Sequence, residues 1–278
     1  MLAEQKRAKV KGNGVNPVRN DVVLKPAFSE RHLNSECGLS LLLKAGPSNG
    51  VNSLMKKLKA DLHLHTKEDP EDIVKYSARE LIDQAYQKGF EVLAITNHNQ
   101  VTYDKYLAEY AREREILLIP GAEATIDKKH VLLLNMDHSL HKIRTFGDLK
   151  SLKDGAGLII APHPFFPSFT SLNSKLREHL NIFDAIEYSH CYLEKINFNK
   201  KAEDLAKEFS LPLIGTSDAH LPWQIGTTYS LIEAEKDLES VIAAIREGKV
   251  EIVTEPLSLP KACSIVWILL SHMMRGGF

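Results

Sequence analysis

Alternation between short apolar segments and longer amphipathic segments is the feature that most restricts how this sequence can fold. The apolar segments are rich in leucine, isoleucine, valine and alanine and have the length of strands, at residues 60–66, 92–96, 116–119, 131–134, 158–161, 185–188, 213–215, 227–232 and 250–253. Strands that alternate with helices are typical of β/α units assembled around a mostly parallel sheet or barrel. We therefore predict an α/β protein.

Helix signals fall between these strands. Ser77, with Glu80 three residues later, forms a capping box, and apolar residues then recur at helical spacing until Gly89. The same spacing predicts further helices near residues 103–111, 202–209 and 238–245. The order of strands and helices agrees with the predicted β/α repeat.

The first 55 residues have a different composition from the rest of the chain. They are rich in lysine, asparagine, glycine, serine and proline, and they offer one compact apolar patch, at residues 39–43. A segment with so little apolar surface to bury is expected to be poorly ordered. We predict an extension at 1–55, a barrel domain at 56–255, and a C-terminal tail or packed helix at 256–278.

Charge and cysteine content restrict the partners and the compartment. The formal net charge of -1 provides no electrostatic attraction for nucleic acid or an acidic membrane, so stable binding to either is not expected. The cysteines, Cys37, Cys191 and Cys263, are odd in number and widely spaced, which argues against a disulfide framework. The N-terminal residues lack the apolar stretch of a signal peptide, and the apolar run 265–270 is too short to cross a bilayer. These features predict a cytoplasmic protein and leave its oligomeric state open.

The segment 60–66 carries the first candidate functional residues. If it is a strand, His63 and His65 point to the same face, where both imidazoles could bind one metal ion. Leu62 and Leu64 would then pack on the opposite face. Because two histidines on one strand are also compatible with an ordinary polar face, the interpretation depends on the rest of the chain.

Further polar residues follow the predicted strands, just beyond their C-terminal ends. These residues are His98, Glu123, His163, Asp218 and His220, and His130 precedes the predicted strand 131–134. Alone, each could be a helix cap, a turn carboxylate or a surface histidine. In a barrel, however, the C-terminal ends of the strands meet at one face, where active sites form. Imidazoles and carboxylates without thiolates suit zinc, manganese or iron, and more than four such ligands imply more than one ion.

Five segments resemble, in the same order, the motifs of the PHP (polymerase and histidinol phosphatase) superfamily. They are DLHLHT at 61–66, ITNHN at 95–99, GAE at 121–123, APHP at 161–164 and GTSDAH at 215–220. The resemblance extends from residue 60 to residue 254, approximately. It implies a distorted (β/α)7-type barrel with a trinuclear metal centre that hydrolyses phosphoesters.

The resemblance also implies a set of metal ligands, transferred residue by residue. The first ion would bind His63, His65, Glu123 and Asp218. Glu123 would bridge to a second ion, which His130 and His163 would complete. A carboxylate bridge offsets the mutual repulsion of two nearby dications, so a histidine would not replace Glu123.

The third ion depends on the loop after the first motif. By resemblance it would bind His98, His220 and one acidic residue of that loop, for which we predict Asp69, with Glu68 and Asp72 as alternatives. The sequence departs from the family at Asn97, where aspartate is usual. Because an amide brings no charge, the hydrogen bonding that supports His98 could differ.

These implied features predict a metal-dependent phosphoesterase or phosphatase that acts on a small phosphorylated substrate, such as a nucleotide or histidinol phosphate. The implied metals are zinc, manganese or iron, three ions in all, which would activate water as hydroxide. The predicted catalytic residues are Glu123, Asp218 and His220. Candidates for substrate binding are Lys67 and His190, and the cations of Lys128, Lys129 and Arg144 are also placed to reach a phosphate.

The sequence is compatible with two other functions. Metal-dependent amidohydrolase barrels also open with a His-x-His strand, but they usually carry a carbamylated lysine at a strand end, and no lysine is placed in that way here. A non-catalytic PHP-like module with a binding or regulatory role would have lost ligands. The nearly complete ligand set argues against that role.

Overall fold

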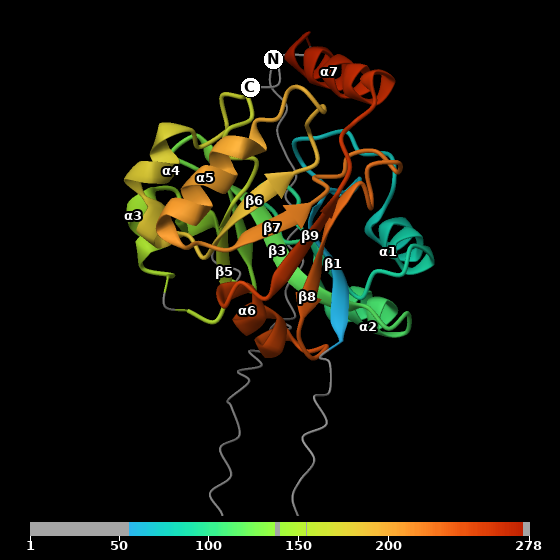
Figure 1. Cartoon of the computed structure of the whole chain (residues 1–278). Helices are drawn as coiled ribbons and strands as arrows, with labels where there is room; N and C mark the ends of the chain where they lie inside the picture. The colour runs from blue at the N-terminus through green and yellow to red at the C-terminus, as the bar shows by residue number, and fades with distance from the viewer. Residues whose placement is uncertain (1–55, 137–139, 154, 275–278) are drawn as a thin grey trace, which may run out of the picture. The chain divides into compact units, whose positions relative to one another are not determined.

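The computed structural model describes residues 56–136, 140–153 and 155–274. The predicted extension at 1–55 lies outside these residues. Within them, nine strands form one sheet in the order β7-β6-β5-β4-β3-β2-β1-β8-β9 (Figure 1). The α/β class is therefore confirmed, with nine strands in place of the seven implied by the family resemblance.

The strands lie close to the predicted segments. Their bounds are β1 (Lys57–Leu64), β2 (Val92–Ile95), β3 (Leu117–Ile126), β4 (Lys129–Leu134), β5 (Leu158–Ala161), β6 (Ala185–Ser189), β7 (Leu213–Thr216), β8 (Thr228–Glu233) and β9 (Val250–Thr254). The helices are α1 (Ala78–Gln87), α2 (Lys105–Arg112), α3 (Phe146–Lys150), α4 (Ser174–Glu178), α5 (Asn199–Phe209), α6 (Leu238–Arg246) and α7 (Leu259–Met274). At α1 the predicted capping box is present, because Ser77 and Glu80 bond each other's backbone N–H groups.

The prediction of a mostly parallel sheet was wrong. The pairs β1·β2, β2·β3, β5·β6 and β6·β7 are parallel, whereas β1·β8, β3·β4, β4·β5 and β8·β9 are antiparallel. The reversal at β4 comes from a two-residue turn in which Asp127 and Lys128 both have positive φ. Such turns join antiparallel strands, so β3 and β4 form a hairpin where the sequence suggested a crossover.

The sheet curls until its two ends approach each other. Ser230 on β8 accepts a hydrogen bond from the Gly215 N–H on β7 at 2.9 Å and donates one to the Gly215 carbonyl at 3.0 Å. A Cβ at Gly215 would lie 2.7 Å from the Ile252 Cγ2 on β9, so only glycine fits this approach. The result is a nearly closed, barrel-like sheet.

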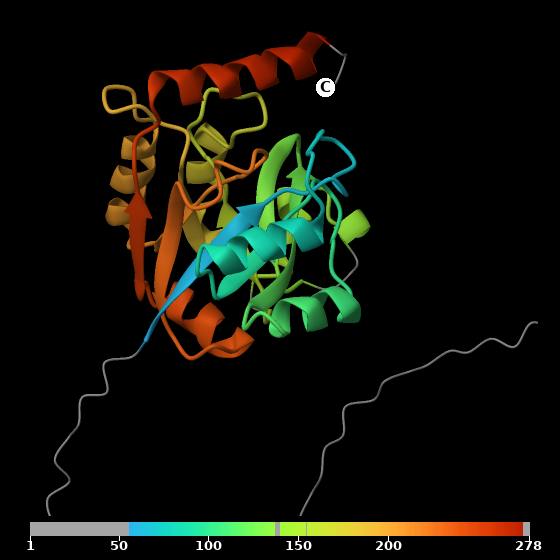
Figure 2. The ribbon, with the colours of Figure 1, turned by 90° about the vertical axis from the view of Figure 1, so that its right-hand side faces the viewer.

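Three apolar clusters hold the helices against the sheet. The first takes residues from β1 to β8 and from α6, including Leu62, Leu132 and Val241, and fills the inside of the barrel. The second packs α3, α4 and α5 on one outer side, and the third packs α1 and α2 on another (Figure 1). Helices α6 and α7 lie at opposite ends of the barrel in both views (Figures 1 and 2).

The predicted C-terminal segment forms a helix, α7, over Leu259–Met274. Among the residues that the structure describes, no helix is both long enough and apolar enough to cross a membrane.

We predicted that Leu62 and Leu64 pack on the same face of β1, and this prediction was wrong because the strand contains a bulge. Leu62 lies in the cluster inside the barrel, whereas Leu64 lies in the outer cluster with α1. The register with β2 shifts between Asp61 and Leu64, and such an irregularity changes the face to which the following side chains point. Strict alternation therefore does not hold at the end of this strand.

Candidate metal centre

The histidines of the first motif lie side by side at the end of β1. The ring centroids of His63 and His65 are 5.1 Å apart, and both side chains are fully buried. His63 is the last residue but one of β1, and His65 follows the strand. The chain beyond β7 lies next to them, because the His65 N–H bonds the Ala219 carbonyl at 3.2 Å.

The position predicted for Glu123 was wrong in one respect. Glu123 does not follow the strand but lies within β3, which continues to Ile126 because its second half pairs with β4. This extension places Glu123 opposite Leu132 and close to His130, which lies on β4 itself. The hairpin therefore delivers both side chains from paired strands.

Four donors surround one point at the end of the barrel. The Nε2 atoms of His63 and His65 lie 3.2 and 3.3 Å from the Glu123 Oε2, and each is 3.3 Å from the Asp218 Oδ1. In a tetrahedral site with bonds of 2.0–2.1 Å, neighbouring donor atoms are about 3.3 Å apart. The buried His65 Nε2 has no hydrogen-bond partner, which is the arrangement expected of an atom that faces an ion. The donor set therefore fits a metal ion.

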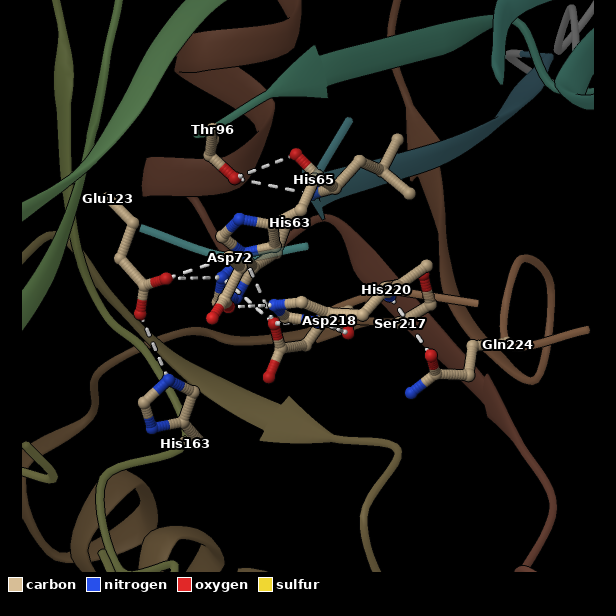
Figure 3. Close-up of polar contacts among 12 residues, drawn as sticks. His63, His65, Asp72, Thr96, Glu123, His163, Ser217, Asp218, His220 and Gln224 are labelled. Atoms are coloured by element: carbon tan, nitrogen blue, oxygen red, sulfur yellow. Dashed lines mark hydrogen bonds and ion pairs between the residues drawn. The ribbon is translucent and has the colours of Figure 1, made fainter. Parts of the chain in front are cut away.

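The other oxygen of Glu123 faces a second pair of imidazoles. Glu123 Oε1 lies 2.7 Å from the His130 Nδ1 and 3.0 Å from the His163 Nε2. Figure 3 shows the Glu123 carboxylate between His163 and the two histidines His63 and His65. One carboxylate thus connects two groups of donors.

A third group of donors lies beside the first. Asp69 Oδ2 is 3.0 Å from the His98 Nδ1, and Asp72 Oδ2 is 2.6 Å from the His220 Nε2. The two pairs are adjacent, because the Asp72 Oδ2 lies 3.8 Å from the His98 Nδ1. The predicted Asp69 and one of its two alternatives, Asp72, therefore reach this group.

Asp69 is held by several hydrogen bonds. Its Oδ1 accepts from the N–H groups of Glu71 and Asp72 at 2.8 and 3.0 Å, and its Oδ2 accepts from the His98 N–H at 2.9 Å. The same Oδ2 lies 2.8 Å from the His65 Nδ1. Asp69 thus shapes the loop and contacts two of the clustered imidazoles.

Glu68 and Asn97 form hydrogen bonds to the backbone and to hydroxyl groups near these donors. The Glu68 carboxylate accepts from the Ala78 N–H at 3.1 Å, at the start of α1. Asn97 accepts from the Thr66 N–H at 2.9 Å and donates to the hydroxyls of Thr66 and Thr102. Asn97 therefore fixes the chain after β1, while Asp69 is the residue that contacts the His98 ring.

The charges in the cluster compensate one another. Burial alone would raise the pKa of Glu123, but the charges of His130, His63 and His98 outweigh it and hold this pKa well below its usual range. Burial would lower the pKa of His63, but Asp218, Glu187 and Glu123 raise it well above the ordinary value. The carboxylates therefore require positive charge beside them, which a divalent ion would provide in place of protons.

Two clustered residues have an uncommon backbone conformation. His163 and Asp218 have φ values of 25° and 45°, in the region that side chains other than glycine rarely adopt. Residues held in this region often occur at functional sites, where the surrounding contacts maintain the strain. Here both residues follow strands, β5 and β7, that end at the cluster.

Sequence reasoning missed Glu187 on β6. Its carboxylate is fully buried and lies 3.0 Å from the His63 Nδ1. The available signal was a single charge inside the apolar segment 185–188, which a buried strand would not carry without a partner.

The predicted substrate-binding residues lie in different surroundings. Lys67 is exposed, in the loop after β1. His190 is buried, its Nε2 is 2.8 Å from the Gln224 Nε2, and burial lowers its pKa to about 4. Beside it, burial raises the pKa of the Cys191 thiol to about 12, so this thiol is neutral and unreactive.

Comparison with known proteins adds a family and a fold. Residues 197–250 match the PHP-associated family. An uncharacterized protein of Methanocaldococcus jannaschii is 26% identical over 167 residues, which cover 54% of this chain and 95% of that protein.

Two solved structures share the fold. One is a two-domain protein of Bacteroides vulgatus containing a predicted PHP-like metal-dependent phosphoesterase, with a TM-score of 0.58, 21% identity, and coverage of 72% of this chain and 65% of that chain. This chain thus spans less than two thirds of that protein. The other is the lesion-specific endonuclease EndoQ of Pyrococcus furiosus, with a TM-score of 0.50, 16% identity, and coverage of 76% and 66%.

The family match, the shared fold and the ordered motifs support one another. The matched family segment extends from just before α5 to the start of β9, and the motifs with clustered side chains lie before it and within it. This chain is therefore similar to the PHP-associated family over residues 197–250, and it shares its fold with a protein that contains a predicted PHP-like phosphoesterase.

Proposed function

We propose that this protein is a metal-dependent phosphoesterase that acts on a small phosphorylated substrate. The observation that carries the proposal is the geometry of Glu123, whose two oxygens face two separate groups of imidazoles. A carboxylate that bridges two ions is a common element of sites that hydrolyse phosphoesters. The two similar solved structures named as a phosphoesterase and an endonuclease agree with this chemistry.

The proposed ligands follow the three groups of donors. His63, His65, Glu123 and Asp218 would hold the first ion. Glu123, His130 and His163 would hold the second. His98, His220, Asp69 and Asp72 would hold the third, so that both aspartates of the loop contribute.

The hydrogen bonds assign a role to each ring nitrogen. Carboxylate and carbonyl oxygens only accept, so the His65 Nδ1 donates to Asp69 and the His220 Nδ1 donates to the Asp218 carbonyl, at 2.8 and 3.0 Å. The Nε2 atoms of these rings are then free of protons and can bind metal.

The protein residues prepare the site for hydrolysis. Divalent ions bound there would lower the pKa of water and neutralise the charge of phosphoryl oxygens. Glu123 and Asp218 supply the negative charge that holds such ions together, and the burial of Glu123 excludes competing water from its oxygens. Asp218 and His220 have side chains that are 21% and 22% exposed, so they form the side of the cluster that a substrate can approach.

The choice of a small substrate rests on charge. The net charge of -1 does not provide the positive surface that binding to a nucleic acid backbone requires. The exposed Lys67, near the loop of Asp69, is a proposed contact for a single phosphate. Because the endonuclease named above shares the fold, a nucleic acid substrate belongs among the compounds to be tested.

A phosphatase screen tests the proposal. The full chain is assayed against nucleotide and sugar phosphates, histidinol phosphate, a phosphodiester and a short single-stranded oligonucleotide, with manganese and then with zinc. We expect hydrolysis of a small phosphomonoester that chelator abolishes and metal restores. Preference for the oligonucleotide would overturn the small substrate, and a protein that binds no metal would favour a non-catalytic module.

A further inference from the structure

Glu187 is a buried charge outside the three groups of donors. It lies on β6, between β5, which leads to His163, and β7, which leads to Asp218. The donor groups found among the described residues do not include it. A buried carboxylate without an ion of its own is costly unless hydrogen bonds satisfy it, so its contacts indicate its role.

Both oxygens of Glu187 are occupied by donors from the metal-site strands. Oε1 lies 3.0 Å from the His63 Nδ1 and accepts a short hydrogen bond from the Thr216 hydroxyl. Oε2 accepts a short hydrogen bond from the backbone N–H of His163. One side chain therefore joins the end of β1, the residue after β5 and the end of β7.

The contact with His63 determines the tautomer of that ring. An ionised carboxylate only accepts hydrogen bonds, so the proton of His63 lies on Nδ1 and the lone pair lies on Nε2. That Nε2 is the atom that faces Glu123 and Asp218.

The contact with His163 supports a strained residue. His163 has a φ of 25°, and its Nε2 faces the other oxygen of Glu123. Its N–H group bonds Glu187, which holds the backbone in this conformation. Glu187 thus acts on one imidazole of the first donor group and on one of the second.

We propose that Glu187 is a positioning residue that prepares the first and second metal positions together, by fixing the tautomer of His63 and the backbone of His163. The inference rests on the proposed metal centre and deepens it. It does not depend on which phosphoester is the substrate.

The isosteric substitution Glu187→Gln tests this role because an amide cannot replace both acceptors. If the amide oxygen faces the His163 N–H, the NH2 group faces the His63 Nδ1. That nitrogen must then accept a hydrogen bond, so the ring proton lies on Nε2, the atom that should bind metal. If the amide is reversed, the NH2 group faces the His163 N–H and the strained backbone loses its partner. Either orientation weakens one metal position.

The experiment measures metal binding directly. The full chain is stripped with chelator, and zinc and manganese affinities are measured by competition with a chromophoric chelator, with bound metal counted by mass spectrometry. For E187Q we expect an affinity about 10- to 100-fold weaker than that of the unsubstituted protein. The melting temperature of the stripped protein should change little, whereas the rise that metal produces should be largely lost.

Thr216→Val is the matched control, because it removes a third hydrogen bond to the same carboxylate and leaves the acceptors for His63 and His163 in place. We expect the metal affinity of T216V to lie within about threefold of that of the unsubstituted protein. This change is smaller than the loss expected when a residue that orients a metal ligand is replaced. An equal loss in T216V would assign the effect to local packing and overturn the proposal. Unchanged affinity in E187Q would overturn it as well.

The two proposals fail in different ways. Metal binding that depends on Glu187 without phosphoesterase activity would refute the proposed function and leave the positioning role intact. An unsubstituted protein that binds no divalent metal would refute both.

Discussion

The donors carried by strands and the donors carried by a loop form two different regions of the candidate site. His63 and Glu123, on β1 and β3, have side chains that are 0% and 1% exposed. Asp72, in the loop after β1, and His220, after β7, have side chains that are 20% and 22% exposed. On the strands, Glu123 lies 3.2 Å from His63 and 2.7 Å from His130, whereas distances in the loop group range from 2.6 to 3.8 Å.

This difference indicates how each region acquires its geometry. Hydrogen bonds between strands fix the backbone at Glu123, and Glu187 supports His63 from behind. The loop depends instead on the bonds that Asp69 makes to its own backbone. Sites on strands are more exact than sites on loops, so we expect the third ion to bind more weakly than the first two.

Glu123→Gln should have the largest effect, because it removes charge from the residue that faces two proposed ion positions. We expect kcat/KM to fall by more than about 100-fold, together with the loss of both tightly bound ions. Metal counting and a phosphatase assay check the result, with the exposed Glu109→Gln as the control. Near-normal turnover in E123Q would refute the bridging role.

Asp218→Asn should have the next largest effect, because Asp218 lies against the first ion position alone. We expect about a 100-fold loss of kcat/KM and the loss of one ion, with the second position retained. The measurement is metal stoichiometry alongside activity. Loss of every ion would mean that the two positions are not separate.

Asp69→Asn and Asp72→Asn compare the two aspartates of the loop. D69N should lower activity by about 10- to 100-fold, because Asp69 also orients His65, and D72N by about 10-fold or less. The affinity of the weakest ion, followed by titration of stripped protein, is the test. A larger effect in D72N would reverse their assigned importance.

Gly215→Ala should have the smallest effect on the site and act on stability. The added Cβ would lie 2.7 Å from the Ile252 Cγ2 and 2.8 Å from the Tyr229 carbonyl, and such crowding costs about 1–3 kcal/mol. Thermal or urea unfolding measures it.

Gly147→Ala, in α3, is the control for this substitution, because its nearest neighbour would lie at an ordinary 3.4 Å. We expect no loss of stability there, since alanine is favoured over glycine in a helix. Equal destabilisation by both substitutions would contradict the proposed crowding between β7 and β9.

Most strands, the main helices and the histidines of the motifs could be predicted from the sequence, because apolar periodicity and capping are local properties. The strand β5 has its predicted bounds, and α1 begins at its predicted capping box. The continuation of β3 through Glu123 could not be predicted, because it depends on pairing with β4. Local patterns do not reveal which strands become neighbours.

The sequence by itself determined which kinds of side chain are available and in what order, since residue types and short-range spacing are written in it. Only the tertiary structure decided how they combine. It brought Glu187 against His63, 124 positions away, and placed Asp72 beside His220, 148 positions away. The physical reason is that hydrogen bonds and ion contacts between distant segments depend on sheet register and barrel closure, which no local pattern specifies.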